Sequence, residues 1–170
     1  MMKMLEAGGI PPLKDEVRTA DVDNPKGYYE YERVKQLPQD TAWLPEAEGK
    51  AVKMVSMLLY ELPKDRQYQV VLMRRAMPEI LASQKKMLLR RNKDMHIDDA
   101  EMKELFEAHL GNLQAWLKEQ THLRVLEVWY NDMMKQAAVE AKRINDFLGG
   151  SLNKTAMVGV VDETLYRNRA

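Results

Sequence analysis

Apolar residues along this chain occur in two patterns, short continuous runs and runs with helical spacing, and residues 69–91 contain both in succession. The run from Val70 to Met73 is short and continuous, which is typical of a strand buried in a parallel sheet. The apolar residues that follow are spaced as on one face of a helix, and Pro78 stands in the first turn of that helix. The pattern predicts a strand over 67–73 and a helix from there to about residue 91.

The same two patterns place the other elements. Strands are predicted at 10–13, within 49–56 and at 123–129, and helices at 1–7, 31–37, 39–44, 137–148 and 154–161. Residues 21–27 and 92–97 are predicted to be polar connections, and 58–65 a loop or a short helix. The glycine pairs at 8–9 and 149–150 are expected to end the helices that precede them.

A long helix is predicted to begin at Asp98 and Asp99, because acidic residues in a first turn complement the helix dipole. Its apolar face is predicted to hold Leu105, Leu110, Leu113, Trp116 and Leu117. Since strands alternate with helices, the expected fold is an α/β domain with a parallel sheet. With no repeat or linker, residues 1–170 are expected to form a single domain.

Composition excludes several classes of protein. The 26 Lys and Arg residues balance the 26 Asp and Glu residues, so no overall field attracts nucleic acid or an anionic membrane. The absence of cysteine excludes disulfides, thiol nucleophiles and cysteine-based zinc sites. Residues 1–12 lack the apolar core of a signal peptide, and no apolar run approaches the ~20 residues that span a bilayer. We expect a cytoplasmic protein.

The strand–helix unit carries the clearest candidate chemistry. Arg74 and Arg75 follow the strand directly, and Ser83 lies about two helical turns after Arg75. A guanidinium at the carboxyl end of a strand and a hydroxyl on the next helix can converge on one phosphate, at the edge where open α/β sheets bind ligands. By spacing alone, a solvated arginine and an ordinary helix serine are an equal alternative. Arg74 is expected to be a surface ion-pair partner.

Six segments support a more specific interpretation. They are NPKGYYEYE at 24–32, GKAVKMV at 49–55, VVLMRRAMPEILASQ at 70–84, VLEVWYNDMM at 125–134, RINDFLG at 143–149 and VVDETLYRNR at 160–169. In this order they resemble the bacterial sulfotransferase-like branch of the P-loop fold. The resemblance implies a three-layer fold, with a parallel sheet between helices on both faces. It also implies that Arg75 and Ser83 hold the 3′-phosphate of the sulfate donor PAPS.

The chain departs from that family at its start. Members of the family begin with a central strand and a phosphate-binding loop of the type PRSGTS, which works through backbone amides at a helix N-terminus. No such loop precedes a helix in this sequence. We therefore expect an N-terminally shortened member that lacks the first central strand and the phosphate loop. That loss would expose the edges of the flanking strands, or pair these strands with each other, and exposed edges leave room for a homo-oligomer.

Other candidates follow from the resemblance. Lys53, expected in a strand, could offset charge on the bridging oxygen of the donor, but Val55 stands where many sulfotransferases have a histidine base. The alternative is a lysine that snorkels from a sheet edge. Tyr28 and Glu30 could form an acceptor-side wall with a general base, and a tight turn with half-buried tyrosines is the alternative.

The remaining charged residues suggest less. Arg167 and Arg169 could reach the 3′-phosphate from the C-terminal segment, or belong to a frayed tail. The basic residues near 85–93 are expected to be a solvated helix end. The three histidines, His96, His109 and His122, lack metal-ligand spacing and are expected at the surface or at helix caps.

The resemblance implies transfer of a sulfuryl group from PAPS to a hydroxyl or amine of a small acceptor, with adenosine 3′,5′-bisphosphate as the nucleotide product and no metal. Activity of this chain is in question, because the loop that cradles the 5′-phosphosulfate has no counterpart in the sequence. Two alternatives stay open: a non-catalytic nucleotide-binding or interaction module on the same scaffold, and a P-loop kinase-like relative that uses ATP.

Overall fold

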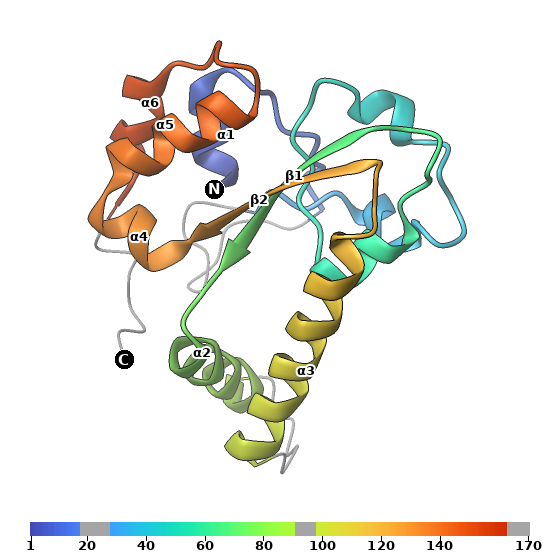
Figure 1. Cartoon of the computed structure of the whole chain (residues 1–170), viewed down its shortest axis with the longest axis vertical. Helices are drawn as coiled ribbons and strands as arrows, with labels where there is room; N and C mark the ends of the chain where they lie inside the picture. Colours follow the sequence, from blue (N-terminus) through green and yellow to red (C-terminus); the bar gives the residue numbers. More distant parts are fainter. Residues whose placement is uncertain (18–27, 91–97, 163–170) are drawn as a thin grey trace. The chain divides into compact units, whose positions relative to one another are not determined.

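The protein is a mixed α/β structure with a small parallel sheet and several helices (Figure 1). The computed structural model describes residues 1–17, 28–90 and 98–162. These residues form two compact units. The first comprises Met1–Arg66 and Ala141–Val161, and the second comprises Gln67–Glu140 with Asp162.

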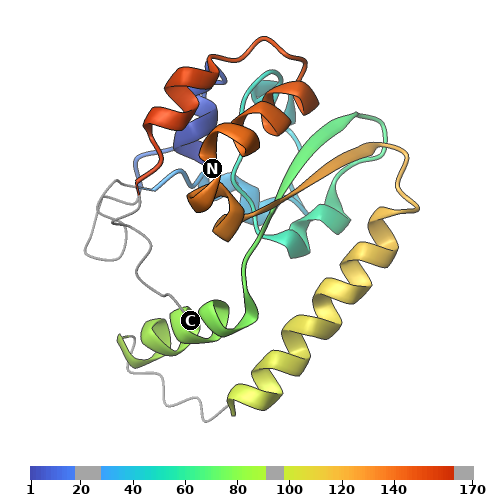
Figure 2. The ribbon, with the colours of Figure 1, turned by 60° about the vertical axis from the view of Figure 1, so that its left-hand side comes forward.

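The second unit is built on two strands. β1 (Tyr68–Arg74) and β2 (Leu123–Trp129) are parallel and paired over seven positions, and they are the only paired strands in the described part of the chain. Parallel strands need a long crossover between them. Here α2 (Met77–Arg90) and α3 (Asp99–Leu117) supply it, and α4 (Tyr130–Lys135) follows β2 directly. Figure 2 shows the two strands side by side, with α3 leading back to β2.

The register assigns the strand residues to two faces, because successive side chains point to opposite sides. Arg74 pairs with Trp129 at the carboxyl ends of the two strands, so both side chains lie on one face. The next residues along each chain, Arg75 and Tyr130, lie just beyond the paired strands and contact each other. The predicted apolar run is buried only at Leu72 within β1; its other members are half-buried.

Helix α3 buries less of its apolar face than its spacing predicts. Leu113 is fully buried, whereas Leu105, which is expected on the same face of the helix, is 57% exposed. The end of α3 lies beside β2, where Leu117 shares a surface groove with Leu123. Leu105 lies more than two turns nearer the helix start and has no such partner strand. Helical spacing determines the side of the helix on which a side chain lies. It does not determine whether another element covers that side chain.

In the first unit, α1 (Met2–Gly8) packs against α6 (Lys154–Gly159). The approach is close, because a Cβ on Gly8 would lie 3.0 Å from Cγ of Met157. Gly9 ends α1 with φ of 107°, a left-handed conformation suited to glycine. The core of this unit includes Met4, Leu5, Trp43, Ile144 and Met157. α5 (Ala137–Phe147) belongs to this unit from Ala141 onward.

Most long elements match their predictions. The strands predicted at 67–73 and 123–129 are confirmed, as are the helices that follow the first strand and those at 1–7, 137–148 and 154–161. The helix predicted at 31–37 is a short 3₁₀ helix at Glu32–Gln36. The helix predicted at 39–44 is wrong, because these residues form turns until a 3₁₀ helix begins at Leu44 and runs to Ala47. A further 3₁₀ helix lies at Ser56–Glu61. Residues 21–27 and 92–97 lie outside the described residues.

The strands predicted at 10–13 and within 49–56 are wrong in extent. Only one bridge forms, a parallel contact between Pro12 and Ala51. The amide of Ala51 donates to the Pro11 carbonyl, and the amide of Leu13 donates to the Ala51 carbonyl. Pro11 and Pro12 have no N–H to donate, so the ladder cannot extend through them. Lys53 therefore does not lie in a strand. Among the described residues, no helix is long and apolar enough to cross a membrane.

Candidate functional site

Arg75 lies immediately after β1, at the carboxyl end of the strand pair. Its Nε donates a hydrogen bond to Oε2 of Glu79 at 2.8 Å. Its guanidinium carbon lies 5.1 Å from the centroid of the Tyr130 ring, within the range of a cation–π contact. The side chain is 29% exposed, so one part of the guanidinium is held by protein while another part reaches solvent.

Glu79 is the buried centre of this cluster. It stands in the first turn of α2, and its side chain is only 2% exposed. Besides Arg75, it accepts a hydrogen bond from Nδ2 of Asn131, whose donor nitrogen lies 2.7 Å from Oε1. The carboxylate thus joins the segment after β1, the start of α2 and the start of α4. Our sequence interpretation missed Glu79, although its i,i+4 spacing from Arg75 was a usable signal.

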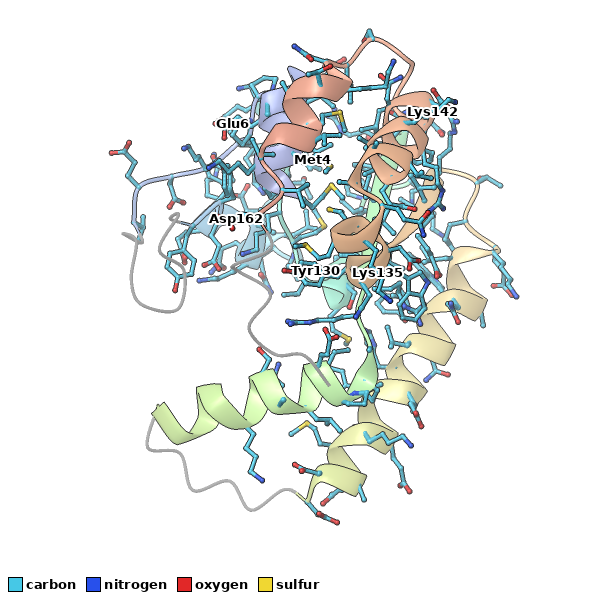
Figure 3. The ribbon with its side chains drawn as sticks, turned by 90° about the vertical axis from the view of Figure 1, so that its left-hand side faces the viewer. Met4, Glu6, Tyr130, Lys135, Lys142 and Asp162 are labelled. Carbon is cyan, nitrogen blue, oxygen red and sulfur yellow. The ribbon has the colours of Figure 1, made fainter. Side chains whose placement is uncertain are left out.

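Tyr130, the first residue of α4, carries the ring that Arg75 covers (Figure 3). Burial is the main cause that raises the pKa of Tyr130 above its usual value. The carboxylates of Glu79 and Asp162 raise this pKa further, and the Arg75 guanidinium opposes them. The phenol is therefore neutral at physiological pH, and the ring presents its face to the cation.

Ser83 is half-buried on α2, one helical turn after Glu79 and two after Arg75. Residues at this spacing lie on the same side of a helix. Glu79 and Ser83 thus lie on one side of α2, and Arg75 contacts Glu79 from the segment before the helix. The joint contact of Arg75 and Ser83 with a phosphate stays a prediction.

Arg74, the last residue of β1, has a similar setting. Its guanidinium carbon lies 5.3 Å from the centroid of Trp129, and its Nη1 lies 3.3 and 3.2 Å from the two carboxylate oxygens of Glu127. Gln114 also donates to Glu127, at 2.9 Å. Arg74 is therefore the ion-pair partner that the sequence predicts. Its expected place at the surface is wrong, because its side chain is only 13% exposed.

An open groove of about 370 Å³ lies beside this second cluster. Its lining comes from the end of α3 and from one face of β2: Gln114, Leu117, Lys118, Leu123, Val125 and Glu127. Glu127 accepts hydrogen bonds from Arg74 and Gln114, and the rest of the lining is three apolar side chains and Lys118.

In the first unit, the structure brings together two other predicted residues. Nζ of Lys53 lies 3.5 Å from Oε1 of Glu30, and their side chains are 44% and 26% exposed. Nearby in sequence, the hydroxyl of Tyr29 donates to Glu6 at 2.5 Å, and Lys14 lies over the Tyr29 ring. Tyr28 is half-buried. The proposed cation and the proposed base thus partly neutralise each other.

Comparison with known proteins decides the family. The sulfotransferase domain model matches residues 49–169, well over half of the chain. The chain belongs to the sulfotransferase family. No curated protein and no solved structure gave a significant match to it.

The range that matches the sulfotransferase model divides the candidate residues. Lys53, Arg75 and Ser83 lie inside it, and Tyr28 and Glu30 lie before it. Arg167 and Arg169 also fall within the match, but they lie outside the described residues of the chain. Family membership therefore bears on the strand–helix unit more directly than on the proposed acceptor wall.

One histidine was placed wrongly. His122 was expected at the surface or at a helix cap, but it is buried, with 3% of its surface exposed. It precedes β2, and its ring stands edge-on to Tyr68 with centroids 6.2 Å apart. Its Nε2 has no hydrogen-bond partner among the described residues. It packs as an aromatic side chain beneath the start of the strand pair.

Proposed function

We propose that this protein binds the sulfate donor PAPS and its product, adenosine 3′,5′-bisphosphate, through Arg75 and Ser83 at the carboxyl end of β1. The supporting observation is the state of the Arg75 guanidinium. Glu79 accepts a hydrogen bond from Nε of Arg75, and no described residue accepts one from the two Nη atoms. Two parallel Nη–H donors suit a phosphate, and the carboxyl edge of parallel strands is where such ligands bind.

In the proposed reaction, an oxygen or nitrogen of a small acceptor attacks the sulfur in line with the leaving group. The bond from sulfur to the bridging phosphate oxygen breaks, adenosine 3′,5′-bisphosphate leaves, and the acceptor loses a proton to a base. Lys53 would offset charge on the bridging oxygen, and Glu30 would take the proton. We also propose that residues 1–170 form one domain of the three-layer P-loop type, since the family match runs through residues of both units.

A second function is favoured by the pair formed by Lys53 and Glu30. A lysine held 3.5 Å from a carboxylate has part of its charge cancelled, and Val55 stands where a histidine base is expected. These features favour a protein that binds the bisphosphate and does not turn PAPS over.

Calorimetric titration with adenosine 3′,5′-bisphosphate and with ATP tests the nucleotide. The proposal predicts at least tenfold tighter binding of the bisphosphate, and it fails if ATP binds equally well or if neither nucleotide binds. Incubation with ³⁵S-labelled PAPS and a panel of phenols and amines then tests the reaction. Labelled acceptor supports the sulfotransferase. Bisphosphate binding without labelled product supports the binding protein.

A further inference from the structure

Glu79 presents a physical problem that the proposed phosphate site does not solve. A carboxylate with 2% of its surface exposed is costly unless it is paired and hydrogen-bonded. Here it lies 2.8 Å from the very cation that is proposed to bind an anion. By charge alone, this carboxylate opposes phosphate binding. A residue that weakens the positive potential of a phosphate site must contribute to the site in some other way.

We propose that Glu79 is a positioning residue that sets the orientation of Arg75 for its phosphate; the inference rests on the proposed function. Asn131 holds one carboxylate oxygen at 2.7 Å, and the other oxygen accepts the Nε–H of Arg75. The Tyr130 ring covers the face of the guanidinium. Because the Arg75 guanidinium is held at Nε and along one face, only its edge with the two Nη atoms is left to bind a ligand.

The neighbouring arginine shows that this arrangement is specific to Arg75. Arg74 also has a carboxylate and an aromatic ring beside it, but its Nη1 contacts both oxygens of Glu127. Its ligand-binding edge is therefore occupied. Its side chain is also less exposed, at 13% against 29% for Arg75. The two adjacent arginines therefore differ in their contacts with carboxylates. Glu127 contacts Arg74 at the edge that could bind a ligand, whereas Glu79 contacts Nε of Arg75 and orients its side chain.

The two roles of Glu79 predict opposite results when its charge is removed. If Glu79 acted only through charge, Glu79→Gln would tighten the binding of adenosine 3′,5′-bisphosphate. If it positions Arg75, Glu79→Gln should weaken binding about tenfold, and Glu79→Ala, which keeps no acceptor at all, should weaken it further. Glu127→Gln is the matched control, because it makes the same change beside Arg74, and it should leave the dissociation constant within about twofold.

A nuclear magnetic resonance signal gives a second readout. The Arg75 Nε–H, held against a buried carboxylate, should exchange slowly and give a distinct cross-peak that Glu79→Ala abolishes and Glu127→Gln leaves in place. If Glu79→Gln does not fold, the Asn131→Leu variant tests the positioning role instead. It removes the anchor of the carboxylate without touching Arg75, and it should weaken bisphosphate binding about threefold.

The outcomes separate the inference from the function on which it rests. Loss of bisphosphate binding in Arg75→Lys, with unchanged or tighter binding in Glu79→Gln, overturns the positioning role and leaves the proposed function in place. Failure of the unaltered chain to bind the bisphosphate overturns both. Weaker binding in Glu79→Gln, with loss of the Nε–H signal in Glu79→Ala, supports the positioning role.

Discussion

Arg74 and Arg75 are adjacent in the chain, yet each contacts a carboxylate and an aromatic ring of its own. Arg74 stacks with Trp129 and contacts Glu127, and Arg75 stacks with Tyr130 and contacts Glu79. The parallel register sets Arg74 opposite Trp129 at the strand ends, and Arg75 and Tyr130 follow directly. Substitutions around Arg75 therefore have matched controls around Arg74.

Removing the Tyr130 ring should weaken nucleotide binding without unfolding the strand pair. A cation–π contact contributes about 1 kcal/mol, so Tyr130→Leu should raise the dissociation constant for adenosine 3′,5′-bisphosphate about fivefold. Tyr130→Phe keeps the ring and should bind like the unaltered chain. Calorimetry measures both. The same loss in Trp129→Leu, which removes the ring beside Arg74, would count against a specific role for the Tyr130 ring.

The pair of Arg75 and Glu79 should be strongly coupled in stability. Arg75→Met leaves Glu79 buried without its cation and should lower the free energy of unfolding by about 3 kcal/mol. Glu79→Leu should cost less, because the 29% exposed Arg75 can turn toward water. The double variant should lie close to the unaltered chain. Urea unfolding of all four proteins measures the coupling, and additive losses would contradict it.

Tyr29 should make part of the stability sensitive to alkaline pH. Burial, the hydrogen bond to Glu6 and the charge of Glu6 raise the pKa of Tyr29 to about 12. An unfolded tyrosine titrates near pH 10, so the folded state retains this proton longer. The associated stability is fully present below about pH 10 and is lost as the pH rises to about 12. Absorbance at 295 nm should show a tyrosine that titrates at about pH 12, which Tyr29→Phe removes. An unchanged titration at about pH 12 in this variant would contradict the assignment.

His122 offers a stabilising substitution. Its ring is buried with an unpartnered Nε2 among the described residues, and such a group costs about 1 kcal/mol or more. His122→Phe keeps the edge-on packing against Tyr68 and should raise the free energy of unfolding by about 1 kcal/mol. His122→Ala opens a cavity and should lower it by about 2 kcal/mol. Chemical denaturation ranks the three proteins, and a less stable phenylalanine variant would show that Nε2 has a structural role.

The sequence predicts a helix or strand correctly where one local pattern determines that element. The apolar run before Arg75 and the one ending at Trp129 became β1 and β2, and the helix spacing after Ala137 became α5. The position of Arg75 at the strand end followed from the same pattern. These features depend on neighbours in the chain, and they were predicted well.

Features that depend on distant partners were not predictable in this way. The burial of Glu79 depends on Asn131, which is 52 residues away, and the environment of His122 depends on Tyr68. The strand expected around Lys53 is missing because its neighbour is a proline pair. An apolar pattern gives the direction of a side chain along its own element, but the partner on the next element decides whether that side chain is buried.

The central claim is that Arg75 binds the 3′-phosphate, and it is tested most directly by comparing two ligands that differ only in this group. Adenosine 3′,5′-bisphosphate should bind the unaltered chain 10- to 100-fold more tightly than adenosine 5′-monophosphate, since a charge-assisted bidentate contact contributes about 1.5–3 kcal/mol. Arg75→Lys should remove most of that difference, and Arg74→Lys should retain it. Equal affinity for the two ligands in the unaltered chain, or the same loss in both variants, would contradict the account.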